Sequence, residues 1–143
     1  PMILCGPGIP ENQKRDAYVY VLDLFPTLCD LVDVPVPDSV EGTSLVGAIQ
    51  NNEPVRETLY FAYNAYQRAM KNDRHKLIEY VVNGRRTTQL FDLQEDPLEL
   101  NNLAEDAEDT VSSMRELLCQ WRDDWDDREP GWGEVFWEGY DGE

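Results

Sequence analysis

The sequence predicts an α+β fold, in which a four-stranded antiparallel sheet is packed by a long C-terminal helix and preceded by a strand and a helix. Three observations predict this fold. The middle of the chain carries β-rich segments separated by turn residues, Asn83-Gly84 is a strong hairpin signal, and apolar residues recur at helical spacing near the end. With 143 residues, the chain is long enough for one domain, or one domain and part of another.

The first 50 residues are expected to form a short strand and a buried helix. The apolar run at 2–5 reads as the strand, closed by the turn Gly-Pro-Gly at 6–8, and residues 17–22 read as a second strand or covered segment. Asp23 is the expected N-cap of the helix, whose buried face would carry Leu24, Leu28 and Leu31. This helix must end before Pro35, and a shorter one is expected at 45–50.

The middle of the chain is expected to form an antiparallel meander of about four strands. Apolar and aromatic residues alternate in these segments, and turns at Asn72-Asp73 and Asn83-Gly84 separate them. The expected strands cover residues 58–66, 67–71, 76–82 and 87–93.

The last helix is expected over residues 107–127. Its apolar positions follow spacings of 3, 4, 3 and 4 and draw one stripe, made of Val111, Met114, Leu118, Trp121 and Trp125. We interpret the stripe as the face that covers the sheet, with an aromatic docking surface as the alternative. The doublets Asp123-Asp124 and Asp126-Asp127 are expected to point into water, and residues 131–143 are expected to form an acidic loop.

Charge and cysteine content exclude several classes of partner. The formal net charge of −17 disfavours nucleic acid and anionic membrane surfaces. No apolar run approaches the roughly 18 residues that span a bilayer, and no signal peptide is visible at the start. The three cysteines are far apart, so buried thiols are expected rather than disulfides or a zinc site.

Seven segments, taken in order, resemble the C-terminal third of sulfatases. The longest are Tyr-Val-Leu-Asp-Leu-Phe-Pro-Thr-Leu at 20–28, the stretch at 36–45 and Asp-Pro-Leu-Glu-Leu-Asn-Asn-Leu at 96–103; the others are 3–9, 67–69, 75–78 and 89–93. The nearest subgroup resembles bacterial arylsulfatases, iduronate sulfatases and N-sulfoglucosamine sulfohydrolases. The resemblance implies that residues 1–50 end the α/β catalytic domain and its main sheet, 51–130 form the C-terminal subdomain, and 131–143 form an acidic tail.

The resemblance also implies what the parent protein does. Sulfatases hydrolyse sulfate esters with a formylglycine nucleophile and a calcium ion, both of which lie upstream of the region that this chain resembles. We therefore expect no catalytic residue, no metal ligand and no cofactor in this chain, which would brace the catalytic domain and shape its pocket. The implied partners are sulfated small molecules or sulfated glycans, and the implied location is the periplasm or the extracellular space.

One segment imitates the formylglycine motif C/S-x-P/A-x-R. Cys5-Gly6-Pro7 satisfies its first three positions, but Ile9 stands where the motif requires Arg. The surrounding residues resemble the later Gly-Pro-Gly turn of the family. We therefore expect Cys5 to remain an unmodified thiol.

Polar and aromatic residues on the bends of the meander are the candidates for contact with substrate at the pocket rim. They are Tyr63, Asn64, Gln67, Arg68 and His75. Arg68 is the most attractive because a guanidinium binds sulfate or carboxylate in a bidentate manner, although it could instead pair with an acid such as Glu79 across the sheet. His75 could equally be structural. A non-catalytic protein-binding module is the alternative function, resting on the Trp-bearing helix and the acidic tail.

Overall fold

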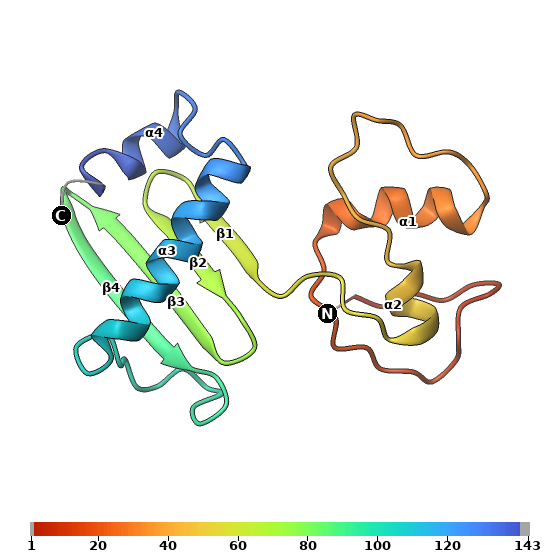
Figure 1. Ribbon diagram of the computed structural model, residues 1–143, viewed down its shortest axis with the longest axis horizontal. Coiled ribbons are helices and arrows are strands. Elements are labelled where there is room, and N and C mark those ends of the chain that lie inside the picture. The colour runs from red at the N-terminus through yellow and green to blue at the C-terminus, as the bar shows by residue number, and fades with distance from the viewer. Residues whose placement is uncertain (1, 141–143) are drawn as a thin grey trace. The chain divides into compact units, whose positions relative to one another are not determined.

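The computed structural model describes residues 2–140 and divides the chain into two compact units, Pro1–Glu57 and Thr58–Glu143 (Figure 1). The first unit is mostly irregular chain around short helices. The second contains all the strands of the described residues and the longest helix. Over the same residues, no helix is both long enough and apolar enough to cross a membrane.

The first unit contains the 3-10 helix η1 (Val21–Asp23) and the helices α1 (Leu24–Leu31) and α2 (Val46–Asn51). A buried ion pair joins the start of this helical region to the end of the unit, since the Asp23 carboxylate accepts hydrogen bonds from both terminal nitrogens of Arg56 at 2.7 and 2.8 Å. Thr27 connects α1 to α2, because its Oγ1 accepts a 2.8 Å hydrogen bond from the Leu45 amide and donates to the Asp23 carbonyl.

Two expectations for this unit are wrong, and a third is confirmed only in part. Residues 2–5 form no strand, because a strand requires a hydrogen-bonded neighbour and none of the described residues pairs with them. Asp23 is the N-cap residue of α1, as expected, but its carboxylate makes no capping hydrogen bond to α1 and accepts instead from the Tyr20 and Thr43 amides. The apolar face of α1 is also exposed rather than buried, with Phe25, Leu28, Leu31 and Val32 open to solvent.

The second unit confirms the expected antiparallel meander. Its strands are β1 (Leu59–Tyr63), β2 (Gln67–Lys71), β3 (His75–Val82) and β4 (Arg85–Asp92), and they lie in the order β1-β2-β3-β4. The left-handed turn at Asn83-Gly84 joins β3 to β4. Tyr60, Met70, Leu77 and Leu90 oppose one another across the four strands, so this row lies on one face of the sheet.

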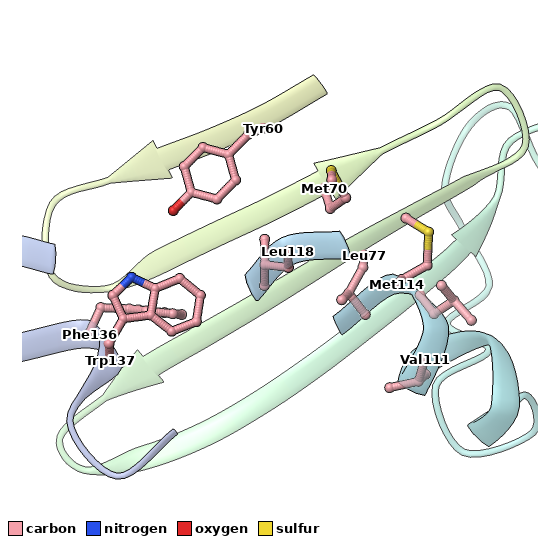
Figure 2. Close-up of a cluster of buried hydrophobic side chains, with 9 residues drawn as sticks. Tyr60, Met70, Leu77, Val111, Met114, Leu118, Phe136 and Trp137 are labelled. Atoms are coloured by element: carbon pink, nitrogen blue, oxygen red, sulfur yellow. The ribbon is translucent and has the colours of Figure 1, made fainter. Parts of the chain in front are cut away.

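Helix α3 (Glu108–Asp124) crosses this face and completes the main core (Figures 1 and 2). Val111, Met114 and Leu118 are buried against the sheet, as the spacing predicts. Trp121 is only partly buried, and its indole N–H donates a 2.9 Å hydrogen bond to Thr58 Oγ1. The stripe therefore packs on the sheet, and its burial decreases toward the C-terminal end, where Trp125 is 44% exposed but its ring still lies 6.0 Å from that of Tyr60.

Residues 132–137, which we expected to lie in a loop, form helix α4 (Trp132–Trp137). Residues 141–143 of the expected loop lie outside the described residues. Phe136 and Trp137 are buried in the main core, and Tyr140 packs against both rings at centroid distances of 6.2 and 4.7 Å. A six-residue helix shows too little periodicity to be recognised from sequence, and its aromatic contacts with the sheet stabilise it.

The packing predicts a large cost for truncating the centre of α3. Leu118→Ala should lower the free energy of unfolding by about 2–5 kcal/mol, because Leu118 is fully buried between α3 and the sheet. Denaturant unfolding, followed by a signal that reports on the second unit, would measure this change. Leu98→Ala, at a position that is largely exposed, should change it by less than about 0.5 kcal/mol. Equal effects would contradict the packing described.

Candidate functional site

Three of the five expected rim residues gather at the turn between β1 and β2. Tyr63 ends β1 and lies opposite Gln67, which begins β2, and Asn64 has the left-handed φ of 48° that starts the turn. The Tyr66 amide closes this turn with a hydrogen bond to the Tyr63 carbonyl at 3.3 Å. Tyr63 and Tyr66 are 64% and 53% exposed, so two aromatic rings project from the turn into solvent.

His75 lies away from this turn. It begins β3 beside the turn at 72–74, and the register places Gln67 and Lys71 at opposite ends of β2. Its amide donates to Asn72 Oδ1 at 2.7 Å, which fixes the backbone of that turn. The structure therefore separates His75 from the other rim candidates by the length of β2.

The rim role expected of Arg68 does not fit its position. Arg68 is 1% exposed, and its guanidinium makes hydrogen bonds within the protein. Nε and Nη2 donate to the two carboxylate oxygens of Asp127, and Nη1 donates to the carbonyls of Asn64 and Gln67 at 2.7 and 2.8 Å. The partner suggested from sequence is also wrong: Glu79 lies opposite Arg68 in the register, but its ion pair is with Arg115.

Asp127 is the residue of this site that the sequence analysis missed. It was expected to point into water, but its carboxylate turns back to the sheet. Oδ2 accepts hydrogen bonds from the Tyr60 hydroxyl at 2.5 Å and the Trp137 indole N–H at 2.8 Å, in addition to that from Arg68. Figure 2 shows the Tyr60 oxygen and the Trp137 nitrogen pointing toward one another. No local pattern marks Asp127, which stands among four similar acids.

The electrostatics of this cluster follow from its contacts. Burial alone would raise the pKa of the Asp127 carboxyl, but the hydrogen bonds from Arg68, Tyr60 and Trp137 outweigh burial and lower it. Burial and the neighbouring Asp127 carboxylate raise the pKa of the Tyr60 hydroxyl, which stays protonated and donates. The Arg68 guanidinium also lies 4.7 Å from the centroid of the Phe136 ring, a favourable cation–π arrangement.

A second buried carboxylate lies on the same face of the sheet and is also fully engaged. Glu79 accepts from Arg115 Nε of α3 at 2.7 Å and from Thr88 Oγ1 of β4 at 2.9 Å. Arg115 Nη2 also donates to Thr88 Oγ1 at 2.8 Å. This group joins α3 to β3 and β4, and its closed hydrogen bonding suits a structural role.

The described residues do not fit the calcium ion or the formylglycine of the family. Residues 2–140 contain no group of three or more His, Cys, Asp or Glu side chains that could hold a metal ion. Cys5 is exposed, contrary to the expectation of buried thiols, but the Arg position of its motif is Ile9. A hollow of about 600 Å³ in the first unit lies between residues 2–19 and α2 and is lined mainly by apolar side chains.

Comparison with known families identifies the region. The family model of the N-sulphoglucosamine sulphohydrolase C-terminal domain matches residues 1–124. The chain therefore belongs to this family and is a sulfatase C-terminal region, as the resemblance indicated. The fold agrees with the family, because the four-stranded sheet and its helices have counterparts in solved sulfatase structures.

Individual relatives support the same conclusion. Arylsulfatase K of Gallus gallus is 32% identical over 131 residues, which cover 82% of this chain and 24% of the relative. Delta 4,5-hexuronate-2-O-sulfatase of Bacteroides thetaiotaomicron is 32% identical over 119 residues, 74% of this chain and 24% of the relative. A protein solved in complex with its substrate, D-glucosamine-2-N,6-O-disulfate, superposes with a TM-score of 0.66 at 26% identity, over 76% of this chain and 24% of that one. The chain thus spans about a quarter of the relatives' length.

The lowered pKa of Asp127 predicts how stability depends on pH. A carboxylate whose pKa is lower in the folded state than in the unfolded state stabilises the fold above about pH 4. This contribution disappears as the pH falls through the pKa of the folded state. Asp127→Asn should therefore cost about 3–5 kcal/mol at pH 7, because it leaves Arg68 buried without a counter-charge. The difference from wild type should shrink below about pH 4.

Urea melts between pH 7 and pH 2.5 would measure this difference. The matched control is Asp124→Asn, at an exposed acid three residues earlier, which should change the free energy of unfolding by less than about 0.5 kcal/mol. A cost for Asp127→Asn that stays constant across the whole pH range would show that the charge of Asp127 does not stabilise the fold.

Proposed function

We propose that the full-length protein that contains this chain hydrolyses sulfate groups of a sulfated glycan. In it, the chain braces the catalytic domain and supplies the β1–β2 turn as one wall of the substrate pocket. The family match carries the first part of the proposal. The glycan is favoured because one relative is named for a sulfated hexuronate and one similar structure holds a sulfated glucosamine.

The bracing role rests on the apolar surface of the first unit. Large apolar side chains of η1 and α1 are exposed, and a cluster of this kind marks an interaction surface. They are Val21, Leu22, Phe25, Leu28, Leu31 and Val32. Because the chain spans about a quarter of its relatives, we propose that the catalytic domain covers this surface and removes it from water.

The wall role rests on the β1–β2 turn. Tyr63 and Tyr66 present two exposed aromatic rings, which suit the apolar faces of sugar rings. The side-chain amides of Asn64 and Gln67 can donate to and accept from sugar hydroxyl groups. Residues 63–67 carry no carboxylate, thiol or imidazole. The turn would therefore bind and orient the substrate, while the chemistry takes place on residues outside this chain.

The activity itself can be tested directly on the full-length protein. We expect it to release sulfate from 4-nitrophenyl sulfate and from D-glucosamine-2-N,6-O-disulfate, and the 143-residue chain alone to release none from either, with or without added calcium. Ion chromatography of released sulfate would measure both, with reactions that lack protein as the control. Turnover by the isolated chain would contradict the assignment of the chemistry to residues outside it, and an inactive full-length protein would contradict the proposed reaction.

The bracing role predicts that truncating an exposed apolar residue of α1 lowers the free energy of unfolding of the full-length protein by more than its contacts within this chain explain. Leu28 is 57% exposed here, so its truncation should be nearly neutral if α1 faces water. If the catalytic domain covers it, Leu28→Ala in the full-length protein should cost about 2–5 kcal/mol. Thermal and urea melts of the full-length protein would decide between these values. Asp30→Ala, on the same helix and exposed, serves as the control and should be nearly neutral in both cases.

A further inference from the structure

The buried cluster around Arg68 holds a surface turn in place. Arg68 Nη1 donates to the carbonyls of Asn64 and Gln67, at the start and at the end of the β1–β2 turn. Nε and Nη2 of the same guanidinium donate hydrogen bonds to the two carboxylate oxygens of Asp127. A bidentate pair fixes the plane of the guanidinium, so the position of Nη1 and of the two carbonyls bound to it follows from the position of Asp127.

Asp127 is positioned in turn by the C-terminal segment. Trp137 of α4 donates its indole N–H to Asp127 Oδ2 at 2.8 Å, and Tyr60 of β1 donates to the same oxygen. The Arg68 guanidinium lies over the Phe136 ring, which belongs to the same helix as Trp137. A continuous series of hydrogen bonds therefore runs from α4, through Asp127 and Arg68, to the backbone of the turn, which is separated from α4 by about 70 residues of sequence.

The chemistry of the cluster suits a role in fixing the orientation of backbone groups. Apolar side chains of similar volume often stabilise a protein core as well as a buried ion pair does, because burying two charges carries a large desolvation cost. Apolar packing, however, cannot hold a carbonyl in one direction. Here the charged pair restrains two carbonyls of a turn whose neighbouring side chains, Tyr63 and Tyr66, are exposed.

We propose that Arg68, Asp127 and Trp137 are positioning residues for substrate recognition. They hold the β1–β2 turn in the conformation in which Tyr63, Asn64 and Gln67 meet the glycan part of a sulfated substrate. The inference rests on the proposed function of the turn as a pocket wall. It assigns Arg68 a role through the turn instead of through contact with substrate, and it makes α4 part of the recognition apparatus.

The test uses two variants and a matched control in the full-length protein. Trp137→Phe removes one hydrogen bond and retains an aromatic ring, and Arg68→Met removes the restraint on the turn while keeping an apolar side chain of comparable length. The control is Trp132→Phe, in the same helix but 68% exposed. Circular dichroism melts would establish that each variant is folded, and Trp137→Phe keeps the test decisive if Arg68→Met does not fold.

Two readouts separate positioning from stability alone. Hydrogen exchange of peptides that cover residues 59–71 should become about tenfold faster or more in both variants, because a hydrogen bond to a charged group is lost. KM for D-glucosamine-2-N,6-O-disulfate should rise about tenfold with kcat within about twofold, as expected when binding is lost equally in the ground and transition states. KM for 4-nitrophenyl sulfate, which lacks the glycan, and all values for Trp132→Phe should be unchanged.

Each contrary result has a separate meaning. Unchanged exchange at the turn in folded variants would overturn the positioning role. Faster exchange with unchanged KM for the disulfated sugar would also overturn it, because the cluster would then restrain a turn that does not contribute to substrate binding. Absence of turnover by the wild-type protein on both substrates would contradict the proposed function, and with it the substrate role of the cluster, which distinguishes that failure from a failure of the positioning role alone.

Discussion

The arrangement of the second unit depends on one buried ion pair, between Arg68 of β2 and Asp127 beyond the end of α3. Removing a guanidinium from water is costly, so it must be met by a carboxylate with good geometry and by further acceptors. This requirement places the chain after α3 against the sheet and brings Trp137 within hydrogen-bonding distance of Asp127. A second requirement follows, because the remaining N–H groups of Arg68 need acceptors, and the carbonyls of the β1–β2 turn supply them.

The two units differ in how completely they bury their apolar residues. In the second unit, the stripe of α3 and the aromatic residues of α4 close one core over the sheet. In the first unit, α1 buries Pro26, Thr27 and Cys29 but leaves its larger apolar side chains in solvent. The hydrophobic effect disfavours such a surface in water. The exposed apolar face of α1 is therefore the observation behind the interface that we propose for the first unit.

The negative net charge of the chain limits how it can contact a sulfated substrate. A net charge of −17 gives a field that repels a sulfated glycan, so attraction to such a substrate must come from positive charge elsewhere in the full-length protein. Arg68 and Arg115, two cations that could have bound sulfate, are instead paired with Asp127 and Glu79. Uncharged contacts from the aromatic and amide side chains of the β1–β2 turn fit this balance, because they add affinity for the sugar without depending on the field.

The sequence by itself determined the features set by short-range patterns. The Asn83-Gly84 turn, the alternation in the strands and the 3–4 spacing of Val111, Met114 and Leu118 were enough for the meander and its covering helix. The gathering of Tyr63, Asn64 and Gln67 at one turn also follows from this pattern. The family followed from the resemblance of seven segments to sulfatases. Only the tertiary structure decided the partner of Arg68, the inward direction of Asp127 and the helix at 132–137. The physical reason is that a charged side chain is satisfied by whichever opposite charge the fold brings within about 3 Å, and Asp127 lies 59 residues away from Arg68 in the sequence.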